Sequence, residues 1–162
     1  MIKLKQLIKE SLKDMVFSKS IKPKHKKRME IETKLFPSNP KLTITPPPAN
    51  DSNETRTELF KLLSYNNGII DRKMVEEFDD MRKPYMELVN KYNLDVTKDD
   101  LQQIIDEGAK FSLKIKYKYN RPRPYQIAEH YGIDDFKIHE LDTAKTPSYP
   151  SGHALQGRLI GL

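Results

Sequence analysis

The sequence contains no cysteine, no tryptophan and no long apolar run. Without cysteine there is no disulfide, thiolate metal site or cysteine nucleophile, so any chemistry has to come from His, Ser, Lys, Arg or carboxylate side chains. No apolar stretch approaches the roughly 20 residues that cross a bilayer, and residues 1–5 lack the apolar region of a secretion signal. These absences predict a soluble, cytoplasmic protein without a transmembrane segment.

Positive charge is concentrated near the N-terminus. The net charge of the 162 residues is +6, but residues 1–30 hold ten Lys or Arg against three acidic residues, so the rest of the chain is close to neutral. A basic arm of this kind is attracted to polyanions such as nucleic acid or an acidic membrane surface. Solvated lysines on a tail are the simpler interpretation of the same charge.

The first 53 residues are expected to form a basic helix and a flexible linker. Apolar residues recur at helical spacing over residues 2–16, with lysines largely on the other faces. Residues 18–53 are polar and rich in proline, including three consecutive prolines at 46–48, and proline favours an extended, solvated backbone. One modest domain is therefore predicted over residues 54–162.

Helical spacing dominates this second part of the chain. It predicts helices over about 54–64, 72–82 and 84–92. We expect the first two to bury Leu59, Phe60, Leu62, Leu63, Met74, Val75, Phe78 and Met81.

A long helix is expected to open at Thr97, which forms a capping-box pattern with Asp100. Residues 113–119 alternate apolar and basic side chains, which is typical of a half-buried strand. We favour a helix because no strong breaker separates this segment from the helical pattern before it. Pro122 and Pro124 then end the helix.

Acidic side chains offer no distinctive spacing for catalysis or metal binding. Paired carboxylates occur at residues 76–77, 79–80 and 99–100, and Asp135 and His139 are ligand types four residues apart. A solvated acidic helix face explains the same residues, so no metal site is predicted.

The sharpest motif is Pro-Ser-Gly-His at residues 150–153, a tetrapeptide that occurs by chance in about one chain per thousand of this length. Ser151 is placed near the N-cap of a helix over 154–160, and a helix N-terminus readily holds phosphate. There Ser151 can donate its hydroxyl, Gly152 lets the backbone approach an anion, and His153 can exchange a proton near neutral pH. A plain turn beside an ordinary histidine is the alternative.

Fixed positive charge precedes this motif. Lys116 and Arg123 are seven residues apart, as are Lys114 and Arg121, so either pair points the same way if the helix lasts that far. Arg binds phosphate with a planar fork and Lys with a compact charge. Lysines alternating with tyrosines also suit a solvated face or a nucleic-acid surface.

Together the two motifs resemble the superfamily of type 2 phosphatidic acid phosphatases, bacterial non-specific acid phosphatases and vanadium haloperoxidases. The first family motif is Lys, six residues, then Arg-Pro, and the second is Pro-Ser-Gly-His. The first motif fits in two registers, of which we prefer Lys116 with Arg123 over Lys114 with Arg121. Tyr149, just before the second motif, is more similar to the soluble acid phosphatases. The resemblance covers about residues 100–162.

The resemblance implies an all-α helical bundle of the acid phosphatase/haloperoxidase type. It implies hydrolysis of a small-molecule phosphomonoester through a phosphohistidine intermediate, with no metal or other cofactor; the haloperoxidase branch holds vanadate in the same pocket. It assigns the phosphoryl oxygens to Lys116, Arg123, Ser151 and the Gly152 amide. It assigns protonation of the leaving alkoxide to His153.

The third family motif is Ser-Arg, five residues, His, three residues, Asp, and it supplies the nucleophilic histidine. This motif does not follow residue 153 in the sequence. The chain is therefore expected to be an incomplete domain whose nucleophile lies outside it. Three other interpretations stay open: an inactive phosphate-binding fragment or pseudoenzyme, a vanadium-dependent haloperoxidase, and a nucleic-acid or assembly protein that uses the basic arm.

Overall fold

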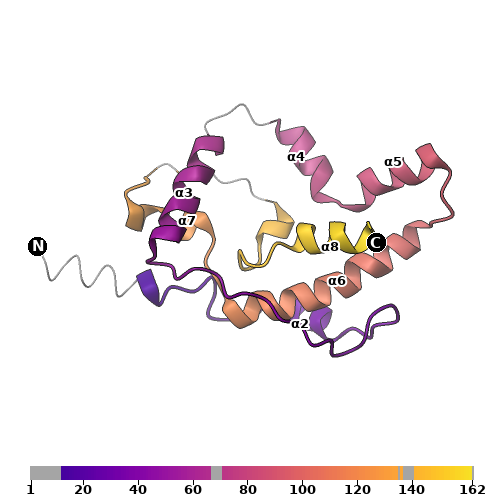
Figure 1. Cartoon of the computed structure of the whole chain (residues 1–162), viewed down its shortest axis with the longest axis horizontal. Helices are drawn as coiled ribbons and strands as arrows, with labels where there is room; N and C mark the ends of the chain where they lie inside the picture. The colour runs from indigo at the N-terminus through magenta and orange to yellow at the C-terminus, as the bar shows by residue number, and fades with distance from the viewer. Residues whose placement is uncertain (1–11, 67–70, 135, 137–140, 162) are drawn as a thin grey trace, which may run out of the picture. The chain divides into compact units, whose positions relative to one another are not determined.

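The computed structural model describes residues 12–66, 71–134, 136 and 141–161. Figure 1 shows the helices α2 (Pro23–Glu30), α3 (Asn53–Asn66), α4 (Arg72–Asp79), α5 (Arg82–Tyr92), α6 (Lys98–Tyr119), α7 (Pro124–Ile127) and α8 (Gly152–Ile160). Two short 3-10 helices, η1 (Ala128–Tyr131) and η2 (Asp142–Ala144), lie between α7 and α8 in the sequence. No strand occurs within those residues, so the all-α prediction is confirmed.

Helix α6 begins and ends where local chemistry predicts. The Thr97 amide donates to Asp100 Oδ2 at 2.8 Å, and the Asp100 amide donates to Thr97 Oγ1 at 3.2 Å, which is the expected reciprocal cap. Residues 113–119 are helical, because the helix runs without interruption to Tyr119. Asn120 then takes a left-handed conformation with φ 46°, and the helix stops before Pro122.

Contacts within the chain divide it into two units. The first comprises the described residues of 1–20, 45–70 and 116–149, and the second those of 21–44, 71–115 and 150–162. Each unit therefore gathers segments that are distant in the sequence. A domain boundary near residue 53 stays a prediction.

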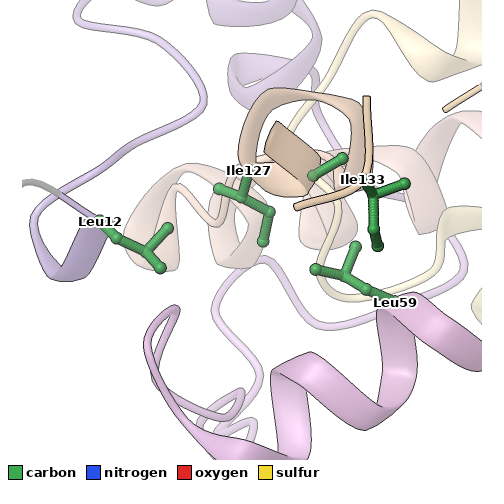
Figure 2. Close-up of a cluster of buried hydrophobic side chains, with 5 residues drawn as sticks. Leu12, Leu59, Ile127 and Ile133 are labelled. Atoms are coloured by element: carbon green, nitrogen blue, oxygen red, sulfur yellow. The ribbon is translucent and has the colours of Figure 1, made fainter. Parts of the chain in front are cut away.

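The core of the first unit is small and apolar. It contains Leu12, Leu59, Ile127, Ala128 and Ile133, four of which are labelled in Figure 2. Each of these residues is at most 6% exposed. Packing of α3 against α7 and η1 therefore buries residues that the sequence separates by about 70 positions.

The second unit is built on residues 98–115 of α6. Its buried apolar residues there are Leu101, Ile105, Ala109, Phe111 and Leu113. Helix α8 lies against α6: Gln156 Nε2 donates to the Ile105 carbonyl at 3.1 Å, and a Cβ on Gly108 would lie 3.1 Å from Leu159 Cδ1. The absent side chain of Gly108 is what lets the two helices approach this closely.

The expectation that residues 18–53 contain no regular element is wrong for residues 23–30, which form α2. Pro23 stands in the first turn, where its missing N–H costs no helical hydrogen bond. Arg28 pairs with Asp106 of α6 at 2.7 Å, and His25 is 6% exposed. Tertiary contacts in the second unit thus order a segment that looks like a linker from its composition.

Several apolar residues expected in the core are exposed. On α3, Leu59 is buried, whereas Phe60 and Leu62 are 43% and 42% exposed. On α4, Met74 and Phe78 are 50% and 55% exposed, and α4 ends at Asp79 rather than at residue 82. A helix that packs on one side buries only one stripe of side chains along its surface. The apolar residues that we expected to be buried cover more of the helix surface than such a stripe.

Some expectations fall outside the described residues. These are most of the helix predicted over 2–16 and the Asp135–His139 ligand pair. In the part of the chain that is described, no helix combines the length and apolar character that a membrane crossing needs.

Candidate functional site

The first motif lies in the first unit, at the junction of α6 and α7. Lys116 stands one turn before the end of α6, and Arg123 is the N-cap residue of α7. The sequence analysis expected Lys116 and Arg123 to point the same way on one continuous helix. In the structure the helix ends at Tyr119, before Arg123. Instead the turn beginning at Asn120 brings the two side chains together.

Lys116 and Arg123 converge on neighbouring carbonyl groups. Lys116 Nζ donates to the Pro147 carbonyl at 2.6 Å, and Arg123 Nε donates to the Thr146 carbonyl at 2.7 Å. Arg123 Nη2 adds weaker contacts to Thr146 Oγ1 and to the Thr143 carbonyl, both at 3.3 Å. One turn of main chain therefore accepts hydrogen bonds from both cations of the preferred register.

The surroundings of these two cations are unfavourable to charge. Burial lowers the pKa of the Lys116 ammonium from 10.5 to about 8, and the nearby Arg123 charge acts in the same direction. Burial also lowers the pKa of Arg123. Lys116 is buried and Arg123 is partly buried. Two close positive charges in such surroundings repel each other, and a dianion between them would relieve that repulsion.

The alternative register is not brought together in this way. Lys114 is exposed on α6. Arg121 turns to α3, where its Nη2 lies 2.7 Å from Glu58 Oε2 and 3.1 Å from Thr55 Oγ1. The structure therefore brings Lys116 and Arg123, and not Lys114 and Arg121, onto one segment of main chain.

The second motif lies in the second unit, at the start of α8. Ser151 is the N-cap residue, and its Oγ accepts a hydrogen bond from the Ala154 amide at 3.2 Å. Gly152 is the first helical residue. This confirms the predicted cap. The Gly152 and His153 amides, which precede these bonds, are directed out of the helix end, as in anion-binding helix N-termini.

His153 is oriented by the end of α4. Its Nε2 lies 3.1 Å from the carbonyl oxygen of Asp79 and 3.7 Å from Asp79 Oδ1. A carbonyl oxygen only accepts, so Nε2 carries the proton in this contact. A histidine that holds a donatable proton on Nε2 can serve as a general acid.

Contacts on both sides of α8 hold the motif in place. The Tyr85 hydroxyl donates to the Gly157 carbonyl at 3.3 Å, and a Cβ on Gly157 would lie 3.2 Å from that hydroxyl. Gly157, which is a weak helix former, is therefore explained by close packing of α8 on α5. Tyr85 and Asp79 are therefore positioning residues, and neither belongs to a sequence motif.

The remaining ionisable candidates do not form a competing site. Asp80 pairs with Arg82 at 2.8 Å, and Asp100 caps α6. His130 is exposed. The described residues contain no group of three or more His, Asp or Glu side chains that could hold a metal ion.

Comparison of the chain with protein-family models, with curated proteins and with solved structures gave no match.

Proposed function

We propose that this chain is the phosphate-binding part of a phosphomonoester hydrolase similar to the acid phosphatases. The observation that carries the proposal is the convergence of Lys116 and Arg123 on the Thr146 and Pro147 carbonyls, a few residues before the Pro-Ser-Gly-His motif. One buried and one partly buried cation that converge in this way have a strong electrostatic reason to bind a dianion.

Both cations keep donors for a phosphoryl group. An ammonium has three N–H groups and a guanidinium five, and the loop carbonyls accept only part of them. In the proposed complex these remaining donors bind the phosphoryl oxygens. They would stabilise the charge that develops on those oxygens during transfer.

The family resemblance assigns the role of proton donor to His153. In such a hydrolysis the P–O bond to the alcohol breaks, and the departing alkoxide takes a proton from the donor. The phosphoryl group passes to a nucleophilic histidine and then to water, which divides the reaction into two displacements. Asp79 holds the His153 ring in place until a substrate arrives.

Binding of inorganic phosphate by the full chain, measured by isothermal titration calorimetry, tests this proposal. Lys116→Gln and Arg123→Gln should each weaken binding at least about tenfold, since each removes a charge-assisted hydrogen bond. Lys114→Gln is the matched control, because Lys114 is exposed on the same helix. Equal affinity of wild type, K116Q and R123Q would refute the proposed site.

The proposal places the nucleophilic histidine outside these 162 residues. The nucleotide sequence after the codon for residue 162 tests this directly. A reading frame that continues into Ser-Arg, five residues, His, three residues, Asp supports a hydrolase. A stop codon together with phosphate binding favours a pseudoenzyme, and bromide oxidation with vanadate and peroxide would favour a haloperoxidase.

Polyanion binding through the basic arm is a second candidate, favoured by the exposed lysines of α2 and the residue before it. Lys22, Lys24, Lys26 and Lys27 are exposed, while His25 faces inward. Replacing Lys24, Lys26 and Lys27 by Gln should weaken binding to duplex DNA. The slope of log affinity against log salt concentration should become shallower by about 0.9 for each phosphate contact that is lost. An unchanged salt slope would exclude this surface.

A further inference from the structure

A cavity of about 240 Å³ lies inside the first unit, between α3 and the segment that carries both arginines of the first motif. Its aliphatic and proline lining consists of Leu59, Leu62, Pro122, Pro124 and Ile127; Thr55, Glu58, Arg121, Arg123 and Ser148 supply its polar groups. Leu59 and Ile127 also belong to the core cluster of Figure 2. The cavity is therefore supported by the packed centre of this unit.

The polar groups of the cavity are held in fixed positions. Arg121 Nη2 donates to Glu58 Oε2 at 2.7 Å and to Thr55 Oγ1 at 3.1 Å. Thr55, which is 1% exposed, donates its own proton to the Ala49 carbonyl at 2.8 Å. Its lone pair is thus directed at Arg121, and the guanidinium is fixed from one side.

The opposite wall is fixed as well. Ser148 Oγ donates to the Pro122 carbonyl at 2.7 Å, and the Ser148 amide donates to the Arg121 carbonyl at 3.0 Å. These bonds join the chain before the Pro-Ser-Gly-His motif to the arginine segment. The cavity is accordingly a built feature with ordered walls on both sides.

We infer that this cavity receives the alcohol portion of the phosphomonoester, and that this portion is a sugar or another polyol. The inference rests on the proposed function, because Arg123 lines the cavity and is also a proposed phosphoryl ligand. A phosphoryl group bound by Arg123 would place its ester oxygen beside the cavity.

The lining selects for hydroxyl groups over a purely apolar group. Glu58 offers carboxylate acceptors, and Arg121 has three N–H donors on Nε and Nη1 besides the two on Nη2 that contact α3. Adjacent hydroxyls of a polyol can accept from one of these residues and donate to the other. An alkyl or aromatic group would instead cover the remaining N–H donors of Arg121 without accepting hydrogen bonds from them, which is unfavourable.

The volume of the cavity and its accessibility also favour a polyol as the ligand. The volume is below the about 300–1,000 Å³ typical of pockets for drug-sized ligands, so the cavity suits a fragment of a few carbon atoms. The aliphatic walls suit the C–H faces of a sugar, and none of the described residues that line it is aromatic. The Glu58 side chain is 49% exposed, which leaves its carboxylate open to an entering ligand.

Calorimetric titrations of the full chain with inorganic phosphate, glucose 6-phosphate, glycerol 1-phosphate and phenyl phosphate test the inference. The measured quantity is the preference, the ratio of each ester's affinity to that of inorganic phosphate. We expect a preference of about tenfold or more for a polyol phosphate and none for phenyl phosphate, as one or two hydrogen bonds to charged groups would give.

Glu58→Gln should reduce the preference for the polyol phosphate to near one. Glu54→Gln is the matched control, since Glu54 is an exposed acid in the first turn of the same helix, and it should keep the wild-type preference. Leu62→Trp is a second variant, which fills the cavity while keeping both charged residues and should also abolish the preference. Circular dichroism melting shows whether each variant is folded.

The possible failures are distinguishable. Phosphate binding without any preference for a polyol phosphate, or a preference that survives in both E58Q and L62W, overturns the inference and leaves the proposed function standing. A preference for phenyl phosphate overturns it in favour of an apolar alcohol. Absence of binding to every probe, inorganic phosphate included, overturns the proposed function and this inference together.

Discussion

Lys116 and Arg123 donate hydrogen bonds to the carbonyls of two consecutive residues, Pro147 and Thr146, at 2.6 and 2.7 Å. Neither helical periodicity nor sequence spacing produces this arrangement, since α6 ends between the two cations. A short turn and the folding back of residues 143–148 produce it. Residues 146 and 147 are thereby held against the first motif of the chain.

Anion binding should weaken above pH 8 because of Lys116. Burial lowers the pKa of Lys116 to about 8, so the free protein carries this charge below pH 8 and loses it above. A bound dianion retains the proton, so its Kd should rise about tenfold per pH unit above pH 8. Sulfate, which stays a dianion over this range, is the probe for calorimetry between pH 7 and 9.5.

Lys116→Arg is the control for this dependence. An arginine keeps its charge throughout the range, so the Kd for sulfate should stay level between pH 7 and 9.5 in that variant. A level profile in the wild type would show that Lys116 does not bind the anion.

Much of the helical architecture could be predicted from the sequence because its signals are local. The Thr97–Asp100 cap, the continuation of α6 through residues 113–119 and the Ser151 cap of α8 all depend on neighbours within a few residues. Capping and periodicity describe such contacts well.

Other features could not be predicted because they depend on distant partners. Acceptor carbonyls such as those of Thr146 and Pro147 have no sequence signature, since every residue has one. Glu107 looks like any acid in a helix, yet it is fully buried. Composition likewise predicts a linker over residues 18–53. It misses α2 because the contacts that order this helix come from α6, about 80 residues away in the sequence.

Glu107 should be among the most important residues for stability. Its carboxylate accepts from the amides of Lys34, Leu35 and Phe36, at distances from 2.7 to 3.1 Å, and from Gln103. Glu107→Ala removes the acceptor for all of these donors, so it should lower the free energy of unfolding by about 3 kcal/mol or more. Urea denaturation followed by circular dichroism measures this loss.

Asp106→Asn is a matched control on the adjacent residue. The Asp106 pair with Arg28 is 36% and 47% exposed, and an exposed pair contributes at most about 1 kcal/mol. Similar losses for E107A and D106N would contradict the anchoring of residues 34–36 by Glu107.

Acid should weaken the fold through Glu107 in a defined direction. Burial raises the pKa of this carboxyl, but the hydrogen bonds from Lys34, Gln103, Leu35 and Phe36 outweigh it and hold the pKa below its usual 4.5. The stabilisation is therefore complete above pH 4.5 and is lost as the pH falls through the folded-state pKa. The difference in unfolding free energy between wild type and E107A should shrink in that range.

His25 should add a second acid-sensitive step. Burial lowers the pKa of His25 below 6.5, and the charges of Lys24, Lys22 and Arg28 lower it further. Below pH 6.5 His25 is protonated in the unfolded chain but stays neutral in the folded chain, so stability falls as the pH drops from 6.5 to the folded-state pKa. His25→Gln should make the melting temperature less dependent on pH over this window. The exposed control His130→Gln should leave that dependence unchanged.

Ser151 separates a structural effect from an anion-binding effect. Ser151→Ala removes the side chain that caps α8 and should cost about 0.5–2 kcal/mol of stability. Ser151→Asp keeps a capping oxygen, and its negative charge suits a helix N-terminus, so stability should be close to wild type. The same charge repels a dianion at that N-terminus, so S151D should lose phosphate binding there although its melting curve is preserved. If S151D bound phosphate as tightly as the wild type, the N-terminus of α8 would not bind phosphate.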